Sequence, residues 1–225
     1  MKKAIMIYGQ PGAGKGTQAN LLSWSKGFFH FDTGKELEWL IHNPAKQSDP
    51  LIQRERVLFD GGQLNTPSWV LKMVSEKAEE IAKAGLGIVF SGSPRTLFEA
   101  FGDEKNIGLI EILEKAYGKE NLHFILLKVH PDSSVFRNTN RKICSVCKTP
   151  VLANHQSEEC PICGGKLYKR VLDTPEKMKI RLEEYENRTK PILAELEKRG
   201  HKISEIDGEP APHEVHKTVL QALNL

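Results

Sequence analysis

The chain has 225 residues and little of several things that mark particular classes of protein. Its net charge is only +3, from 32 Lys+Arg against 29 Asp+Glu, which argues against a nucleic-acid coat or a polybasic membrane anchor. No apolar run approaches the about 20 residues of a membrane span, and the run before Gly9 is too short for a signal peptide. We therefore expect a cytoplasmic protein without a nucleic-acid or membrane partner.

Cysteine is absent outside one short segment, where Cys144, Cys147, Cys160 and Cys163 form two Cys-x-x-Cys pairs. A secreted disulfide scaffold would distribute its cysteines along the chain. Two such pairs can instead surround one Zn²⁺ with four thiolates and leave no position open for water. The pattern predicts a structural zinc site in a reducing compartment, with two disulfides or a redox-active pair as the alternatives.

Short apolar runs alternate with helical stretches along the rest of the chain, a pattern typical of βαβ units. We predict an α/β fold in which a five-stranded parallel sheet carries helices on both faces. The strands are expected over residues 4–8, 28–31, 87–90, 123–129 and 202–206. Residues 33–84 and 141–173 depart from the alternation and are expected to form excursions from the sheet.

Other residues are expected to have structural roles. Asp173 and Glu176 have the spacing of a capping box at the start of a helix. An apolar stripe at helical spacing continues that helix through Met178, Leu182, Tyr185, Ile192 and Leu196. Packing is favoured over base stacking for Trp24, Trp39 and Trp69. No chemistry is assigned to His30, His42 and His123.

The glycine-rich segment Gly9–Thr17 directly follows the first predicted strand and leads into a predicted helix from Lys15 to Trp24. Its glycines let successive backbone N–H groups face phosphate oxygens, and the N-terminus of the helix favours anions. Lys15 can reach the β- and γ-phosphates of a nucleotide. An ordinary glycine-rich turn is the alternative. The predicted phosphate-binding residues are Gly12, Ala13, Gly14, Lys15, Gly16 and Thr17, where Gly16 stands at the usual Ser/Thr position.

This form of the loop resembles that of adenylate kinases and related nucleoside monophosphate kinases, and the resemblance extends along nearly the whole chain. Gly92–Thr96 matches a Gly-Phe-Pro-Arg-Thr motif except at Ser93. Arg137 and Arg141 are spaced like the two arginines that open the family's lid. The remaining similar positions are Thr33, Gly34 and Leu37, the turn Gly62–Pro67, and Arg170, Asp173, Glu176, Arg181, Leu182 and Tyr185.

The resemblance implies a P-loop core of residues 1–32, 67–140 and 174–225, a helical arm at 33–66 that binds the nucleoside monophosphate, and a zinc lid at 141–173. It also implies transfer of the γ-phosphoryl of ATP, with Mg²⁺, to a nucleoside monophosphate, with AMP preferred. The alternatives are a nucleotide-binding homologue with weak or no turnover and a kinase for another base, such as GMP. The chain is expected to be a monomer.

The resemblance also gives residues their roles. Charge spread over a loose phosphoryl-transfer transition state is stabilised by cations, and the expected cationic cage is Lys15, Arg95, Arg141, Arg170 and Arg181. ATP is expected to contact Arg137, Arg141 and Pro210 besides the glycine-rich loop. The acceptor is expected to contact Thr33, Gln63, Leu64, Asn65, Gly92, Ser93, Pro94, Arg95, Glu99, Arg170 and Arg181.

Three positions depart from the family's pattern. Ser91 replaces an aspartate that helps hold Mg²⁺ through water, and Glu38 replaces an arginine that meets the acceptor phosphate. Lys35 lies on the same predicted helical face as Glu38 and is a candidate for the missing charge. Glu99 replaces a glutamine that reads adenine. An ionised carboxylate only accepts hydrogen bonds, so Glu99 suits the two adjacent donors of guanine better than adenine. The alternative is that Glu99 turns to solvent or pairs with a nearby cation while the backbone reads the base.

Overall fold

The computed structural model describes residues 2–152, 154–169 and 173–225. A five-stranded parallel sheet forms its centre, in the order β2 (Phe29–Phe31), β3 (Ile88–Phe90), β1 (Ala4–Tyr8), β4 (Leu122–Lys128) and β8 (Ile203–Asp207). The predicted strands are confirmed to within one or two residues. All residues of β1 are buried, as expected for a central strand of a parallel sheet that is covered on both faces.

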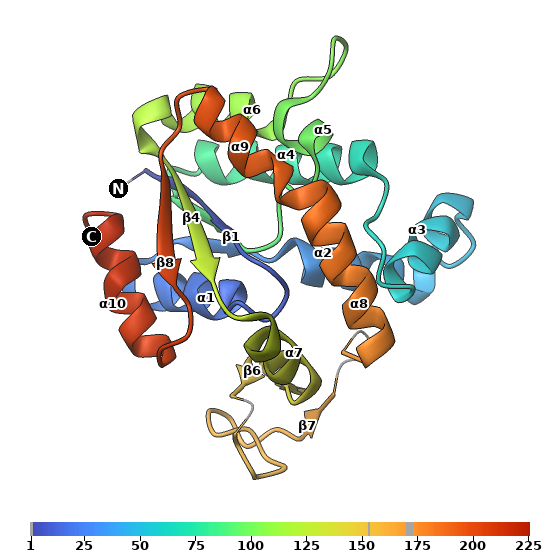
Figure 1. Ribbon diagram of the computed structural model, residues 1–225. Helices are drawn as coiled ribbons and strands as arrows, with labels where there is room; N and C mark the ends of the chain where they lie inside the picture. Colours follow the sequence, from blue (N-terminus) through green and yellow to red (C-terminus); the bar gives the residue numbers. More distant parts are fainter. Residues whose placement is uncertain (1, 153, 170–172) are drawn as a thin grey trace.

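Helices cover both faces of the sheet (Figure 1). Alternate side chains of a strand point to opposite faces, so Ile5 and Ile7 of β1 pack with α1 (Lys15–Lys26) and α10 (Pro212–Ala222). Ala4, Met6 and Tyr8 pack on the opposite face. The helices there are α4 (Pro67–Lys83), α6 (Leu109–Tyr117) and α9 (Pro191–Lys198).

Two groups of elements lie outside this layered core (Figure 1). The first consists of α2 (Thr33–Ile41), the 3-10 turn η1 (Pro44–Lys46) and α3 (Pro50–Asp60). The second is a small antiparallel sheet in the order β6 (Pro150–Val151), β5 (Lys142–Cys144) and β7 (Leu167–Tyr168). The remaining elements are α5 (Leu97–Phe101), the 3-10 turn η2 (Lys119–Asn121), α7 (Pro131–Thr139), α8 (Pro175–Glu184) and the π-helical turn η3 (Tyr185–Thr189). None of the helices in the described part of the chain has the length and apolarity needed to cross a membrane.

Some local expectations were wrong. Thr174, not Asp173, caps α8, since its hydroxyl accepts the N–H of Lys177. Trp24 and Trp39 are 63% and 67% exposed, because α1 and α2 turn other residues toward the core, such as Leu22 and Leu37. Trp69, by contrast, packs against the core as expected.

Candidate active site

The glycine-rich loop connects β1 to α1 in a conformation that its glycines permit. Gly9, Gly12 and Gly14 all have positive φ values, which L side chains rarely adopt. A Cβ on Gly12 would also lie 2.2 Å from Nδ2 of Asn138, so α7 can pack closely on the loop only beside glycine. Ser134 of α7 donates a hydrogen bond to the Pro11 carbonyl.

A pocket beside this loop gathers residues from distant parts of the sequence. It lies at the carboxyl ends of β1 and β3, the edge at which open α/β sheets bind ligands. The residues predicted from sequence that line it are Lys15, Thr33, Gln63, Leu64, Asn65, Gly92, Ser93, Pro94, Arg95, Glu99 and Arg181. The other phosphate-loop residues, Arg137, Arg141 and Pro210 are outside this lining, and Arg170 lies outside the described residues.

Lys15 is held over the loop, where its Nζ donates to the carbonyls of Gly9 at 2.7 Å and Gln10 at 3.0 Å. Burial, together with the positive charges of Arg95, Arg181 and Arg141, lowers the pKa of Lys15 to about 7. The negative charge of a phosphate would raise this pKa again by favouring the charged ammonium. The lysine is therefore poised to gain full charge when an anion arrives.

We expect ATP binding at pH 8 to take up close to one proton per chain. The free lysine is then mostly neutral, because its pKa is about 7, and phosphate contact raises that pKa so that the lysine becomes protonated. Calorimetric titrations in buffers of different ionisation enthalpy measure the proton count. Lys15→Met should abolish the uptake, and equal binding enthalpies in all buffers would contradict the assignment.

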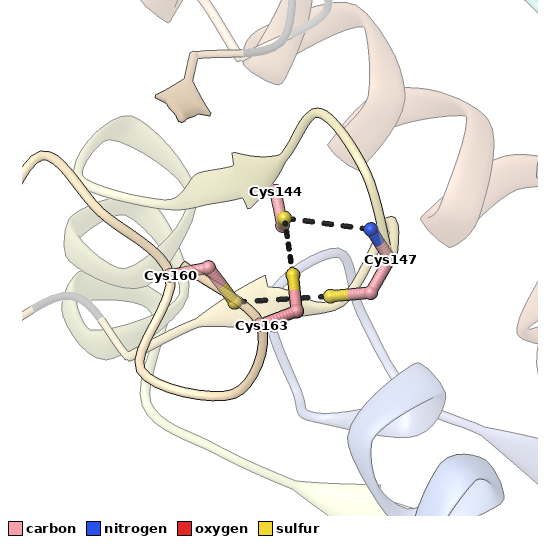
Figure 2. Close-up of side chains that lie close together, drawn as sticks. All are labelled: Cys144, Cys147, Cys160 and Cys163. Atoms are coloured by element: carbon pink, nitrogen blue, oxygen red, sulfur yellow. Dashed lines mark hydrogen bonds between the residues drawn. The ribbon is translucent and has the colours of Figure 1, made fainter. Parts of the chain in front are cut away.

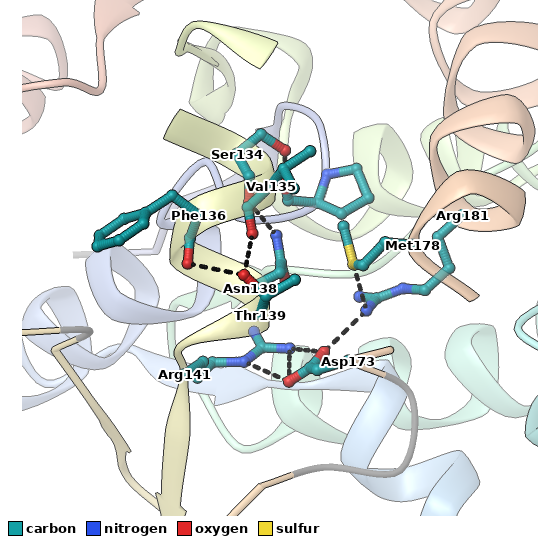
Figure 3. Close-up of polar contacts among 10 residues, drawn as sticks. Ser134, Val135, Phe136, Asn138, Thr139, Arg141, Asp173, Met178 and Arg181 are labelled. Atoms are coloured by element: carbon teal, nitrogen blue, oxygen red, sulfur yellow. Dashed lines mark hydrogen bonds and ion pairs between the residues drawn. The ribbon is translucent and has the colours of Figure 1, made fainter. Parts of the chain in front are cut away.

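Asp173 holds two of the predicted cationic residues together (Figure 3). Its carboxylate, 2% exposed, accepts hydrogen bonds from Arg141 at 2.7 Å and from Arg181 at 3.1 Å. Arg141 immediately precedes β5 and Arg181 is on α8, so Asp173 joins the small sheet to the pocket wall. Sequence reasoning missed this role, because only the fold brings Arg141 and Asp173 together.

Arg137 and Arg95 are also fixed by the chain itself. Arg137 donates to the carbonyls of Gly208 at 2.8 Å and Glu209 at 2.9 Å, which places it beside the loop that contains Pro210. Arg95 Nε donates to the Gly92 carbonyl at 2.8 Å. These contacts set the direction of each guanidinium before a ligand arrives.

Glu55 of α3 positions the loop predicted to hold the acceptor. Its side chain is fully buried and accepts hydrogen bonds from Asn65 Nδ2 at 3.0 Å, from the Thr66 N–H at 2.9 Å and from the Thr66 hydroxyl. Burial alone would raise the pKa of Glu55, but the hydrogen bonds from Thr66, Asn65 and Arg54 outweigh it and lower the pKa. The Asn65 amide group thus donates to Glu55, and no pattern in the sequence predicts this contact.

Glu55→Gln should destabilise the protein by about 1–3 kcal/mol at neutral pH, since buried donors lose a charged acceptor. The folded pKa of Glu55 is depressed, so its stabilisation is complete above the unfolded pKa of about 4.3 and is lost as pH falls below that value. Urea unfolding from pH 7 to pH 3 measures both effects. Glu183→Gln, at an exposed site on α8, is the control. A pH dependence unchanged in Glu55→Gln would contradict this assignment.

Glu99 and Tyr8 form the inner end of the pocket. Glu99 is 3% exposed and accepts hydrogen bonds from the Arg95 N–H at 2.9 Å and the Thr96 hydroxyl at 3.0 Å; its burial raises its pKa. Tyr8 is 3% exposed, and its hydroxyl has no hydrogen-bond partner among the described residues. A buried donor without a partner beside a carboxylate gives this end of the pocket the means to read a polar ligand.

The four cysteines converge as predicted (Figure 2). All four Sγ atoms lie within 4.8 Å of one another, with Cys144 and Cys163 at 3.4 Å and Cys147 and Cys160 at 3.7 Å. Tetrahedral Zn²⁺ with Zn–S bonds of about 2.3 Å requires sulfur atoms about 3.8 Å apart. No disulfide joins these four cysteines. The cluster can hold a metal ion.

A glycine-rich loop, its lysine and arginines at the carboxyl edge of a parallel sheet together define a P-loop enzyme of phosphoryl transfer. The family model for adenylate kinase matches residues 7–201. The chain is 30% identical to the adenylate kinase of Borrelia recurrentis (98% of this chain, 96% of the relative), 33% to that of Rhizorhabdus wittichii (91% of each) and 31% to that of Bacillus velezensis (97% of each). The chain belongs to the adenylate kinase family, whose members are nucleoside monophosphate kinases.

Proposed function

We propose that the chain transfers the γ-phosphoryl group of ATP to AMP in the pocket described above. The observation that carries the proposal is the convergence of Lys15, Arg95 and Arg181 on one pocket beside the glycine-rich loop. Phosphoryl transfer through a loose transition state asks the protein mainly for positioning and positive charge. Arg141 and Arg170 complete the cage in this proposal.

In this proposal ATP and the acceptor nucleotide bind on opposite sides of these cationic residues. The loop from Gly12 to Thr17 binds the ATP phosphates, with Arg137 and Pro210 toward the donor nucleoside. The acceptor binds to residues that line the pocket, namely Thr33, the 63–65 turn and Gly92–Arg95. Residues 33–66 then serve as the acceptor arm and residues 141–173 as the lid. The same proposal has the chain act as a cytoplasmic monomer.

Two metals belong to the proposal. Mg²⁺ bound to ATP neutralises part of the triphosphate charge; it prefers oxygen ligands and keeps several waters, and the hydroxyl of Thr17 in the first turn of α1 is such a ligand. Zn²⁺ on the four cysteines is structural. The sulfur spacings fit tetrahedral coordination, and the ligand set leaves no position for water.

A coupled assay with Mg²⁺-ATP and each of AMP, GMP, CMP and UMP tests the function. We expect ADP formation with the highest kcat/KM for AMP. Absence of turnover with all four acceptors would favour the nucleotide-binding homologue without catalysis. A preference for GMP would keep the reaction and change the substrate.

The acceptor base is addressed by Glu99→Gln, which should raise the AMP-to-GMP ratio of kcat/KM by one to two decades. Each carboxylate oxygen of Glu99 already holds one hydrogen bond and can accept another from a base. A glutamine amide adds a donor for the N1 acceptor of adenine, and leaving such a buried group unpaired costs about 1–3 kcal/mol. Glu184→Gln, also at the pocket, is the control. An unchanged or lower ratio would show that Glu99 does not read the base.

A further inference from the structure

Three side chains from separate elements form a hydrogen-bonded chain that ends in the pocket. His30 of β2 lies between Asn20 of α1 and Ser91, which directly follows β3. His30 Nδ1 is 2.7 Å from Asn20 Oδ1, and His30 Nε2 is 2.7 Å from Ser91 Oγ. Ser91 is 8% exposed and lines the pocket together with Gly9 and Lys15.

The partners of His30 fix where its proton lies. The amide oxygen of Asn20 only accepts hydrogen bonds, so Nδ1 carries the proton and donates it. Nε2 is then the unprotonated nitrogen and accepts the Ser91 hydroxyl proton. Burial lowers the pKa of His30 to about 4, which keeps the imidazole neutral at physiological pH.

This order of groups is that of an activated nucleophile. A serine hydroxyl within hydrogen-bond reach of an imidazole, which a third group orients, is the arrangement from which serine attacks an electrophile. β3 pairs with β1, so Ser91 and the glycine-rich loop lie side by side at one edge of the sheet. The electrophile brought to this edge by the proposed function is the γ-phosphoryl group of ATP.

We propose that Ser91 is a second phosphoryl acceptor, which takes the γ-phosphoryl group of ATP when no nucleoside monophosphate is bound. Ser91 Oγ forms a bond to the γ-phosphorus while the bond from that phosphorus to the β,γ-bridging oxygen breaks. ADP leaves with the bonding electron pair. The hydroxyl proton passes to His30 Nε2, and the imidazolium that forms keeps its Nδ1 hydrogen bond to Asn20. The negative charges of Asp32 and of the ATP phosphates stabilise this imidazolium against the effect of burial.

Phosphoserine accumulates in this scheme, because phosphate-monoester hydrolysis without a catalyst is among the slowest of reactions. The product is therefore a chain with one phosphoryl group on Ser91. Ser25 supplies a matched comparison. Its hydroxyl also faces an imidazole, with His216 Nε2 at 3.1 Å, but Ser25 is outside the pocket lining.

The test is intact-mass and peptide mass spectrometry of the full chain after incubation with Mg²⁺-ATP and no acceptor. We expect one phosphoryl group on Ser91, none in Ser91→Ala, and unchanged labelling of Ser91 in Ser25→Ala. His30→Gln should slow labelling by about a hundredfold, as for loss of a general base, while a thermal melt reports whether it folds. Addition of AMP should suppress labelling.

The inference rests on ATP binding in the proposed site, so the AMP assay is run on the same preparations. Wild-type chain that makes ADP from ATP and AMP but carries no phosphoserine overturns the inference alone. Chain that does neither overturns the proposed function with it. Labelling of Ser91→Ala at another residue, or labelling of folded His30→Gln at the wild-type rate, also overturns the inference.

Discussion

Lys15→Ala and Arg95→Ala are each expected to lower kcat at least about a hundredfold, the loss typical of removing one charge contact to the transition state. Lys15 is held over the glycine-rich loop by two carbonyls, and Arg95 is fixed by the Gly92 carbonyl. Each is thus placed before substrate binds. Neither alanine removes a residue of the apolar core, so the free energy of unfolding should change little.

Steady-state kinetics and thermal melts of both variants test this expectation. Lys83→Ala, at an exposed site near the end of α4, and Arg199→Ala, which follows α9, are the matched controls and should retain turnover. A near wild-type kcat in either variant would show that the substituted residue does not stabilise the transition state. A variant with a collapsed melting temperature would show a structural role instead.

The second large effect is expected at the cysteine cluster, where Cys144→Ser should release the metal. Purified under reducing conditions, the wild-type chain should contain one Zn²⁺. Among the described residues of 141–152 and 154–169, the buried ones are Ile143, Cys144, Val151 and Cys160. With so little apolar core, this region depends on the metal for its fold, since binding free energy of a structural site is folding free energy.

Elemental analysis and limited proteolysis measure the two parts of that effect. Cys144→Ser should be cleaved within residues 141–169 while the central sheet still melts as in wild type. Ser145→Ala, an exposed non-ligand beside the same cysteine, should keep its metal. Wild-type protein without stoichiometric metal would contradict the zinc assignment.

Local patterns predicted the strands, the glycine-rich loop and the cysteine cluster, since each of these depends on neighbours in sequence. The contacts that shape the pocket depend instead on the fold. Glu55 of α3 contacts Asn65 and Thr66, which lie 10 and 11 residues further along the chain. Asp173 contacts Arg141 only because α7, which precedes Arg141, and α8, which follows Asp173, lie together. Periodicity also failed for Trp39, because an aromatic residue at helical spacing does not reveal which face of α2 packs.

The carboxylate of Asp173 acts as a resident counter-ion for the site. Arg141 and Arg181 both pair with Asp173, so a phosphate that binds them must replace the hydrogen bonds of this carboxylate. Hydrogen bonds to charged groups each contribute about 1.5–3 kcal/mol. When the phosphate leaves, the hydrogen bonds from the two arginines to Asp173 form again and offset much of the free energy of losing the phosphate contacts. Asp173 therefore limits how tightly the two arginines bind a nucleotide, which favours product release.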